Sequence, residues 1–127
     1  MIYKILVLVV MIFLHIVDDY YLQGILAQLK QKEWWEKNTP KPLYKYDYLV
    51  ALFMHSFSWS FMIMFPILLY TIIFGNFNYD FYIIFIINIF AHMGIDNLKA
   101  NEKKINLISD QSLHMWQIIL TWFDLIL

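Results

Sequence analysis

Histidine and aspartate recur in this sequence at a separation of four residues, in three widely spaced places. The pairs are His15 with Asp19, His92 with Asp96, and Asp110 with His114. Residues four apart lie on one face of an α-helix, so each pair would present an imidazole and a carboxylate side by side. A helix with such a pair can offer both groups to one metal ion, or it can use the carboxylate to orient the imidazole. The pairs therefore predict a metal site built from helices.

Three further polar residues extend this set, namely His55, Gln23 and Gln111. His55 adds a fourth imidazole, whereas the two carboxamides could orient metal ligands from outside by hydrogen bonding. We place Asp18 off the inward face, because it lies outside the spacing of four. The candidate metal ligands are thus His15, Asp19, His55, His92, Asp96, Asp110 and His114.

The sequence contains no cysteine, so a metal ion here would be held by nitrogen and oxygen atoms alone. We expect a divalent ion and favour zinc, which binds histidine and aspartate. A structural zinc takes four ligands, and a catalytic zinc often takes three plus water. Seven candidates therefore mean either that two ions bind or that some residues only orient the ligands. The sequence leaves both alternatives open.

Hydrolysis is the reaction that such a centre could support. Water bound to the ion would be acidified toward neutrality, and Asp19 could take its proton. Lys99, one helical turn beyond Asp96, could reach a phosphate. We therefore expect a metal-dependent membrane hydrolase acting on a lipid or phosphoester substrate, with Asp19 and Lys99 as its catalytic candidates. The alternatives are a metal or proton transport subunit, and a structural membrane protein that works through partners.

Composition indicates that these residues belong to a membrane protein. The chain is 61% hydrophobic with a mean hydropathy of +0.58, and only 15% of its residues are charged. The net charge of -1 provides no basic surface for nucleic acid. We predict one integral membrane domain over residues 1–127, an all-α four-helix bundle with helices at about 5–29, 48–74, 81–98 and 107–127. No small-residue cleavage site follows the first apolar run, which favours a retained helix over a signal peptide.

The lysines predict the orientation. Eight of the nine lie in the loops 30–47 and 99–106, and none lies in the turn 75–80. By the positive-inside rule those two loops are cytoplasmic and both termini lie outside the plasma (inner) membrane. Each polar site then falls in the cytoplasmic half of its helix, and four segments share that depth only if their side chains meet. Because four helices make a thin bundle, we also expect homo-oligomers in the bilayer.

The order of these motifs resembles a known family of small bacterial and phage membrane proteins. The motifs are H-x-x-x-D-x-x-x-Q in the first helix, a lone histidine in the second, H-x-x-x-D-x-x-K-A at the end of the third and D-Q-x-x-H at the start of the fourth. They comprise His15, Asp19 and Gln23, then His55, then His92, Asp96, Lys99 and Ala100, then Asp110, Gln111 and His114. In this order they resemble the domain of unknown function 3307 family across almost the whole chain. The resemblance implies a helical membrane architecture with a polar cluster, and it implies no reaction.

Overall fold

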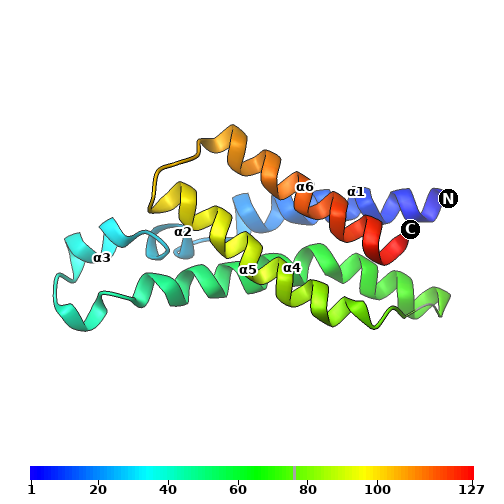
Figure 1. Cartoon of the computed structure of the whole chain (residues 1–127), viewed down its shortest axis with the longest axis horizontal. Coiled ribbons are helices and arrows are strands. Elements are labelled where there is room, and N and C mark those ends of the chain that lie inside the picture. Colours follow the sequence, from blue (N-terminus) through cyan, green and yellow to red (C-terminus); the bar gives the residue numbers. More distant parts are fainter. Residues whose placement is uncertain (76) are drawn as a thin grey trace.

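The computed structural model describes residues 1–75 and 77–127, and it contains helices and no strands in that part of the chain (Figure 1). The four long helices are α1 (Ile2–Ile16), α4 (Asp47–Phe74), α5 (Asp80–Ala100) and α6 (Leu107–Ile126). Two short helices, α2 (Leu26–Leu29) and α3 (Lys32–Asn38), lie between α1 and α4. The prediction of an all-α chain is confirmed. The helices expected at 48–74, 81–98 and 107–127 agree with α4, α5 and α6 to within two residues.

Residues suited to helix ends delimit α4 and α6. Gly75 ends α4 in the left-handed conformation, with φ of 72°, and its N–H donates to the carbonyl of Thr71. Asn106 begins α6, because its side chain accepts a hydrogen bond from the backbone N–H of Ser109. Asn76, in the predicted turn 75–80, lies outside the described residues.

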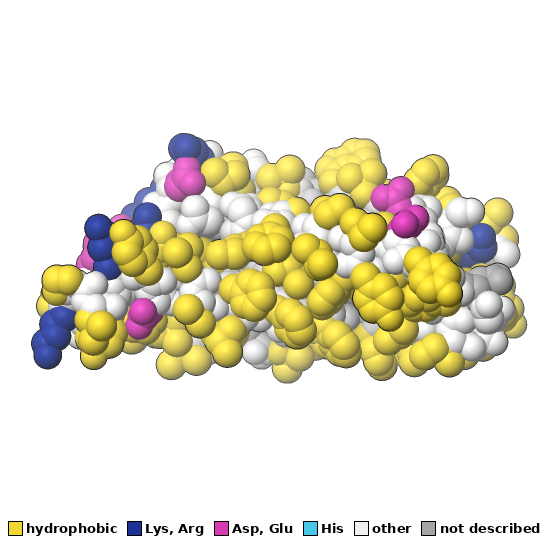
Figure 2. Space-filling model, turned by 60° about the horizontal axis from the view of Figure 1, so that its bottom comes forward, with side chains coloured by type: hydrophobic (Ala, Val, Ile, Leu, Met, Phe, Trp, Pro, Cys, Tyr) yellow, Lys and Arg dark blue, Asp and Glu magenta, His cyan; other side chains and the backbone are white. Residues whose placement is uncertain are grey.

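The long helices run side by side and alternate in direction (Figure 1). α4 packs against α1, α5 and α6, and α6 also packs against α1 and α5. Both chain termini lie at one end, which we call the terminal end. The other end, which we call the loop end, carries α3 and the connection between α5 and α6 (Figure 1). Lysine side chains gather mainly at the loop end, and apolar side chains cover much of the length between the two ends (Figure 2).

Three segments are long and apolar enough to cross a membrane by length and composition. They are Ile2–Leu22, Pro42–Phe74 and Asp80–Ala100. Many of their large apolar side chains are exposed, as expected of helices that face lipid. Within the described residues α6 is not among these segments, because polar side chains such as Gln111 and Gln117 interrupt its apolar sequence.

An apolar core fills the terminal half of the protein. It is formed by α1, α4 and α6 through Val7, Met11, Trp59, Ile63, Met64, Ile67, Ile118, Leu125 and Ile126. Side chains from α5 such as Phe81 and Phe85 pack against it. The loop half between the same helices is filled by polar side chains instead, so the interior is divided along its length.

The prediction of one continuous first helix over 5–29 is wrong at its C-terminal end. α1 continues as a π-helical turn over Val17–Leu22, and the helix stops before Gly24. Gly24 has φ of 53°, a left-handed conformation that glycine adopts without a Cβ penalty. The chain then continues toward the loop end through α2 (Figure 1). The segment 30–47 also differs from a plain loop, since it contains α3 and a 3-10 turn over Pro42–Tyr44.

Two glycines with different backbone conformations should respond oppositely to the same substitution. Gly24→Ala should lower the free energy of unfolding by about 1–2 kcal/mol, the cost of a left-handed alanine. Gly94 lies inside α5 with open space around a built Cβ, so Gly94→Ala should raise it by about 0.5–1 kcal/mol through helix propensity. Reversible unfolding in mixed detergent micelles measures both changes. A shift of the same sign in both variants would contradict the assigned turn at Gly24.

Candidate metal centre

The histidines and aspartates of four segments converge in one buried volume in the loop half of the protein. They come from the C-terminal part of α1 and its π-helical turn, and from α4, α5 and α6. The side chains of His15, His55, His92 and His114 are each 1% exposed or less. Asp96 and Asp110 are 3% and 1% exposed. Charged groups this deeply buried need partners, so each contact in this volume bears on its chemistry.

His92, Asp96 and His114 form one group of three potential ligands, all fully buried. His114 Nε2 lies 3.3 Å from Asp96 Oδ1, and His92 Nε2 lies 3.8 Å from the same oxygen. A tetrahedral ion with bonds of about 2.0–2.2 Å separates its ligand atoms by roughly 3.3–3.6 Å. The observed separations are close to this range, so these residues could hold one ion.

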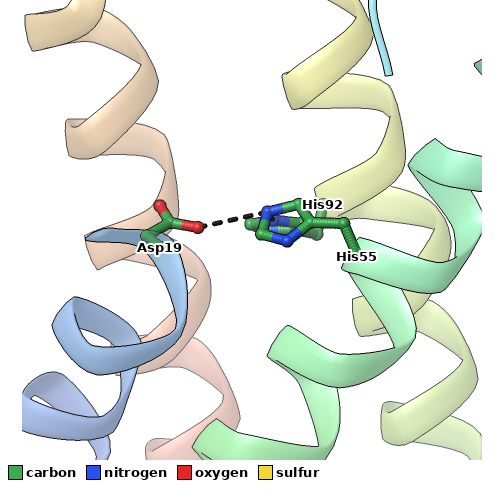
Figure 3. A group of neighbouring side chains, drawn as sticks. All are labelled: Asp19, His55 and His92. Carbon is green, nitrogen blue, oxygen red and sulfur yellow. Dashed lines mark hydrogen bonds and ion pairs between the residues drawn. The ribbon is translucent and has the colours of Figure 1, made fainter. Parts of the chain in front are cut away.

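Asp19, His55 and His92 form a second group, which shares His92 with the first. His55 Nε2 lies 3.2 Å from Asp19 Oδ1 and 3.2 Å from His92 Nε2. Figure 3 shows Asp19 reaching from the π-helical turn toward the rings of His55 on α4 and His92 on α5. Asp96 links the two groups, because its Oδ2 lies 3.4 Å from His55 Nε2 while its Oδ1 faces His114.

The π-helical turn corrects the prediction for Asp18, which was placed off the inward face. Asp18 is 1% exposed, accepts a hydrogen bond of 2.7 Å from Ser58 Oγ, and lies 3.8 Å from His55 Nδ1. A π-helical turn is wider than an α-helical turn, so side chains of neighbouring residues diverge by a smaller angle. Asp18 and Asp19 therefore both face α4, one beside each nitrogen of His55. His55 Nε2 points into the centre, while its Nδ1 faces Asp18.

His15 lies next to the centre, and both of its ring nitrogens have other partners. Trp59 Nε1 donates to His15 Nδ1 at 2.7 Å, and His15 Nε2 lies 3.0 Å from Gln111 Oε1. The Trp59 ring also stacks on His92 with a centroid distance of 4.1 Å, and His92 stacks on His114 at 4.2 Å. These contacts place His15 as a support of the centre, and Trp59 as its boundary with the apolar core.

The two glutamines predicted to orient ligands differ in their positions. Gln111 Nε2 donates to Asp110 Oδ2 at 3.0 Å and to Asp19 Oδ2 at 3.3 Å, so one carboxamide links α6 to the π-helical turn. Gln23 instead donates to the backbone carbonyl of Asp19 at 3.0 Å. Gln23 follows the π-helical turn, where the spacing of four no longer defines a common face, so its side chain does not join the centre.

Two lysines approach the carboxylates of the centre. Lys30 Nζ donates to Asp96 Oδ2 at 2.6 Å, and Lys99 Nζ donates to Asp110 Oδ2 at 2.8 Å. The side chains of Lys30 and Lys99 are 13% and 38% exposed. Sequence reasoning identified Lys99 from its spacing to Asp96, and the structure pairs it with Asp110 instead. Lys30 was missed, because it reaches Asp96 across 66 residues through the turn at Gly24.

Several polar atoms of the centre have no hydrogen-bond partner among the described residues. They are His92 Nδ1, His114 Nδ1 and Nε2, Asp18 Oδ2, Asp19 Oδ1 and Asp110 Oδ1. Buried polar groups nearly always have a partner, which can be an ion or water. His114 Nε2 lies 3.3 Å from Asp96 Oδ1 and 3.5 Å from Asp110 Oδ1, between two oxygens that attract a cation. This position fits a metal ion held by nitrogen and oxygen atoms.

Comparison with protein-family models, curated proteins and solved structures found no match to this chain. The resemblance to the domain of unknown function 3307 family therefore stays a prediction that rests on the motifs.

The hydrogen bond from Trp59 predicts a loss of stability that stacking alone would not cause. Trp59→Phe keeps an aromatic ring on His92 and removes the donor to His15 Nδ1. Leaving that buried acceptor unpaired should cost about 1–3 kcal/mol in the free energy of unfolding. Trp116 on α6 is 62% exposed, so Trp116→Phe is the matched control and should stay within about 0.5 kcal/mol of the parent. Equal stabilities of the two variants would remove the structural role assigned to this bond.

Proposed function

We propose that all four long helices span a membrane, with the loop end on the cytoplasmic side. Three of them are apolar enough to do so, and α6 runs beside them back to the terminal end (Figure 1). The lysines of segments 30–45 and 99–104 gather at the loop end, as the positive-inside rule expects of cytoplasmic loops. The polar side chains of Asp110, His114 and Thr121 on α6 are buried against its neighbours, which would keep them away from lipid, and Asp124 is exposed near the terminal end.

The centre of this four-helix membrane bundle binds a divalent ion, with zinc favoured. His92, Asp96 and His114 supply one ligand atom each. The single observation that carries the proposal is the unpartnered His114 Nε2, which lies 3.3 Å from Asp96 Oδ1 and 3.5 Å from Asp110 Oδ1, separations that suit a tetrahedral ion. Two histidines and one carboxylate leave a fourth position for water, which is the usual composition of a catalytic zinc site.

The reaction that this arrangement supports best is hydrolysis of a phosphoester, carried by a lipid or another phosphorylated substrate. A bound zinc ion would supply an acidified water and would polarise the substrate. Asp19 is the base, because its Oδ1 has no hydrogen-bond partner and lies beside His55 at the edge of the ligand set. It takes a proton as the water oxygen bonds to phosphorus, and the bond between phosphorus and the leaving oxygen breaks. The leaving oxygen then takes this proton from Asp19, which restores the base.

Transport of a metal ion or proton is the second candidate function, favoured by a separate polar network. Asn88, one turn before His92 on α5, donates to Thr121 Oγ1 at 2.9 Å. Gln117 on α6 donates to Asn88 Oδ1 at 2.8 Å. Buried polar side chains thus continue from the centre toward the terminal end along the contact between α5 and α6. Uptake of zinc or protons by liposomes that contain the purified protein tests this alternative.

Metal content across a panel of variants tests the centre. The full chain, purified in mild detergent and titrated with zinc, should hold zinc by elemental analysis. His92→Ala, Asp96→Ala and His114→Ala should each lower the zinc affinity by at least 10 to 100-fold, the range seen even when an orienting partner is lost. Asp124→Ala, on the exposed face of α6 near the terminal end, is the matched control and should bind zinc as the parent does. A parent without zinc, or unchanged zinc in Asp96→Ala and His114→Ala, would remove the metal proposal.

Substitution of the base separates an enzyme from a metal-binding scaffold. Asp19→Asn keeps the size and an oxygen of this side chain but removes its ability to take a proton. The zinc-loaded variant should hydrolyse a chromogenic phosphoester about 10² to 10⁴-fold more slowly than the parent, the usual contribution of a general base. Zinc content measured on the same sample shows whether the ion is retained. Zinc binding without hydrolysis by the parent would exclude the hydrolase and leave transport or a structural role.

A further inference from the structure

The two lysines of the centre are arranged in the same way around His114. Asp96 and Asp110 each turn their Oδ1 toward His114 Nε2, at 3.3 Å and 3.5 Å. The Oδ2 of each carboxylate accepts a hydrogen bond from a lysine. Lys30 donates to Asp96, and Lys99 donates to Asp110. An ion held by His92, Asp96 and His114 would use Asp96 Oδ1, and Asp110 turns its Oδ1 to the same side, so the ion would not displace either ammonium group. The two cations therefore lie on the outer side of the same two carboxylates.

Each ammonium group keeps hydrogen-bonding capacity beyond its carboxylate. A lysine ammonium has three N–H donors, and the bond to a single carboxylate oxygen uses one of them. The Lys99 side chain is 38% exposed and that of Lys30 is 13% exposed, so both are reached from the loop end. The remaining donors can therefore serve an acceptor that approaches the centre from that end.

The backbone fixes Lys30 to the end of α5, two residues beyond Lys99. Asn101 Nδ2 donates to the carbonyl of Lys30 at 3.0 Å, and the N–H of Lys32 donates to Asn101 Oδ1 at 2.7 Å. This pair of bonds holds the segment after Gly24 against the C-terminal turn of α5. Lys30 and Lys99 are thus positioned together, because the segment that contains Lys30 is hydrogen-bonded to the C-terminal turn of α5 that contains Lys99.

We propose that Lys30 and Lys99 form a binding site for the phosphate group of the substrate, on the loop side of the metal position. The inference rests on the proposed metal centre and adds the chemical class of the ligand and a residue, Lys30, that recognises it. Phosphate suits this site because it offers several oxygens that accept from the two ammonium groups while another faces the ion. A neutral ester would leave the remaining donors of a largely buried lysine unused.

Phosphate binding by the zinc-loaded full chain tests the pair. Inorganic phosphate, added to protein in mild detergent and followed by calorimetry, should bind the parent. Lys30→Met and Lys99→Met should each weaken binding roughly tenfold to a hundredfold, the value of a hydrogen bond to a charged group. Zinc content at saturating zinc should stay at the parent level in both. Lys37→Met, on α3 at the same end, is the matched control and should bind phosphate normally. Lys30→Arg keeps the charge and should retain most of the phosphate affinity. If Lys30→Met does not fold, Lys30→Arg and Lys99→Met together test the proposal.

The source of the phosphate is distinguished by the same variants in a bilayer. Nanodiscs of phosphatidylcholine alone are compared with nanodiscs of equal parts phosphatidylcholine and phosphatidic acid. Lysine-dependent protection from thermal unfolding by phosphatidic acid, without binding of inorganic phosphate, identifies a lipid headgroup. Lysine-dependent binding of inorganic phosphate identifies a soluble phosphate compound as a sufficient ligand. A parent that holds zinc but responds to neither, or Lys30→Met and Lys99→Met variants that respond as the parent does, would overturn this inference alone. A parent that holds no zinc would overturn the proposed function.

Discussion

The rest of this structure depends on four carboxylates that lie between apolar helices, those of Asp18, Asp19, Asp96 and Asp110. In the membrane-spanning bundle proposed above, an ionisable residue inside a helix costs about 2.5–3.5 kcal/mol, so four would cost roughly 10–14 kcal/mol, comparable to the whole stability of a typical domain. Lys30 and Lys99 neutralise two of the four charges, and Ser58 and Gln111 donate to the oxygens. Two negative charges remain if all four carboxylates are ionised and the four histidines are neutral. One divalent ion would balance them, so the count of charges agrees with the ligand geometry.

The irregular parts of the backbone lie where this compensation is made. The π-helical turn at Val17–Leu22 brings Asp18 and Asp19 to opposite nitrogens of His55. The left-handed Gly24 ends the helix, and Lys30, six residues further on, reaches Asp96. π-Helical turns are rare and are found frequently at functional sites. A regular helix through residue 29 would lose both contacts, which gives the break at Gly24 a reason in the centre and not in local propensity.

The sequence was enough to predict the helices and the level along them at which their histidines and aspartates meet. It was not enough to predict the contacts that complete the centre. Apolar runs and end residues such as Gly75 and Asn106 define α4, α5 and α6, because helix formation there is local. The spacing of four identified the His/Asp pairs on the same grounds. The rule failed for Asp18 and Gln23, because a π-helical turn changes which residues share a face.

Contacts between segments that are distant in the sequence could not be predicted from residue spacing either. Lys30 reaches Asp96 across 66 residues, and Trp59 reaches His15 across 44. Both depend on how the helices pack, and no spacing within one segment reports it. In the sequence, Trp59 is only an aromatic residue in an apolar helix. Such residues commonly face lipid or a core, so nothing marked Trp59 as part of the centre.

The position of Trp59 also bears on which function the centre can serve. Its ring stacks on His92 and belongs to the apolar core with Met11, Ile63 and Ile118, which lie on the terminal side of the centre. The polar network at Asn88, on the contact between α5 and α6, also touches Met64 of the same core. From the loop end, the centre is approached past the partly exposed side chains of Lys30 and Lys99. Transport requires access from both sides in turn, whereas hydrolysis requires access from one, so the apolar core on the terminal side favours the proposed hydrolase over the proposed transport.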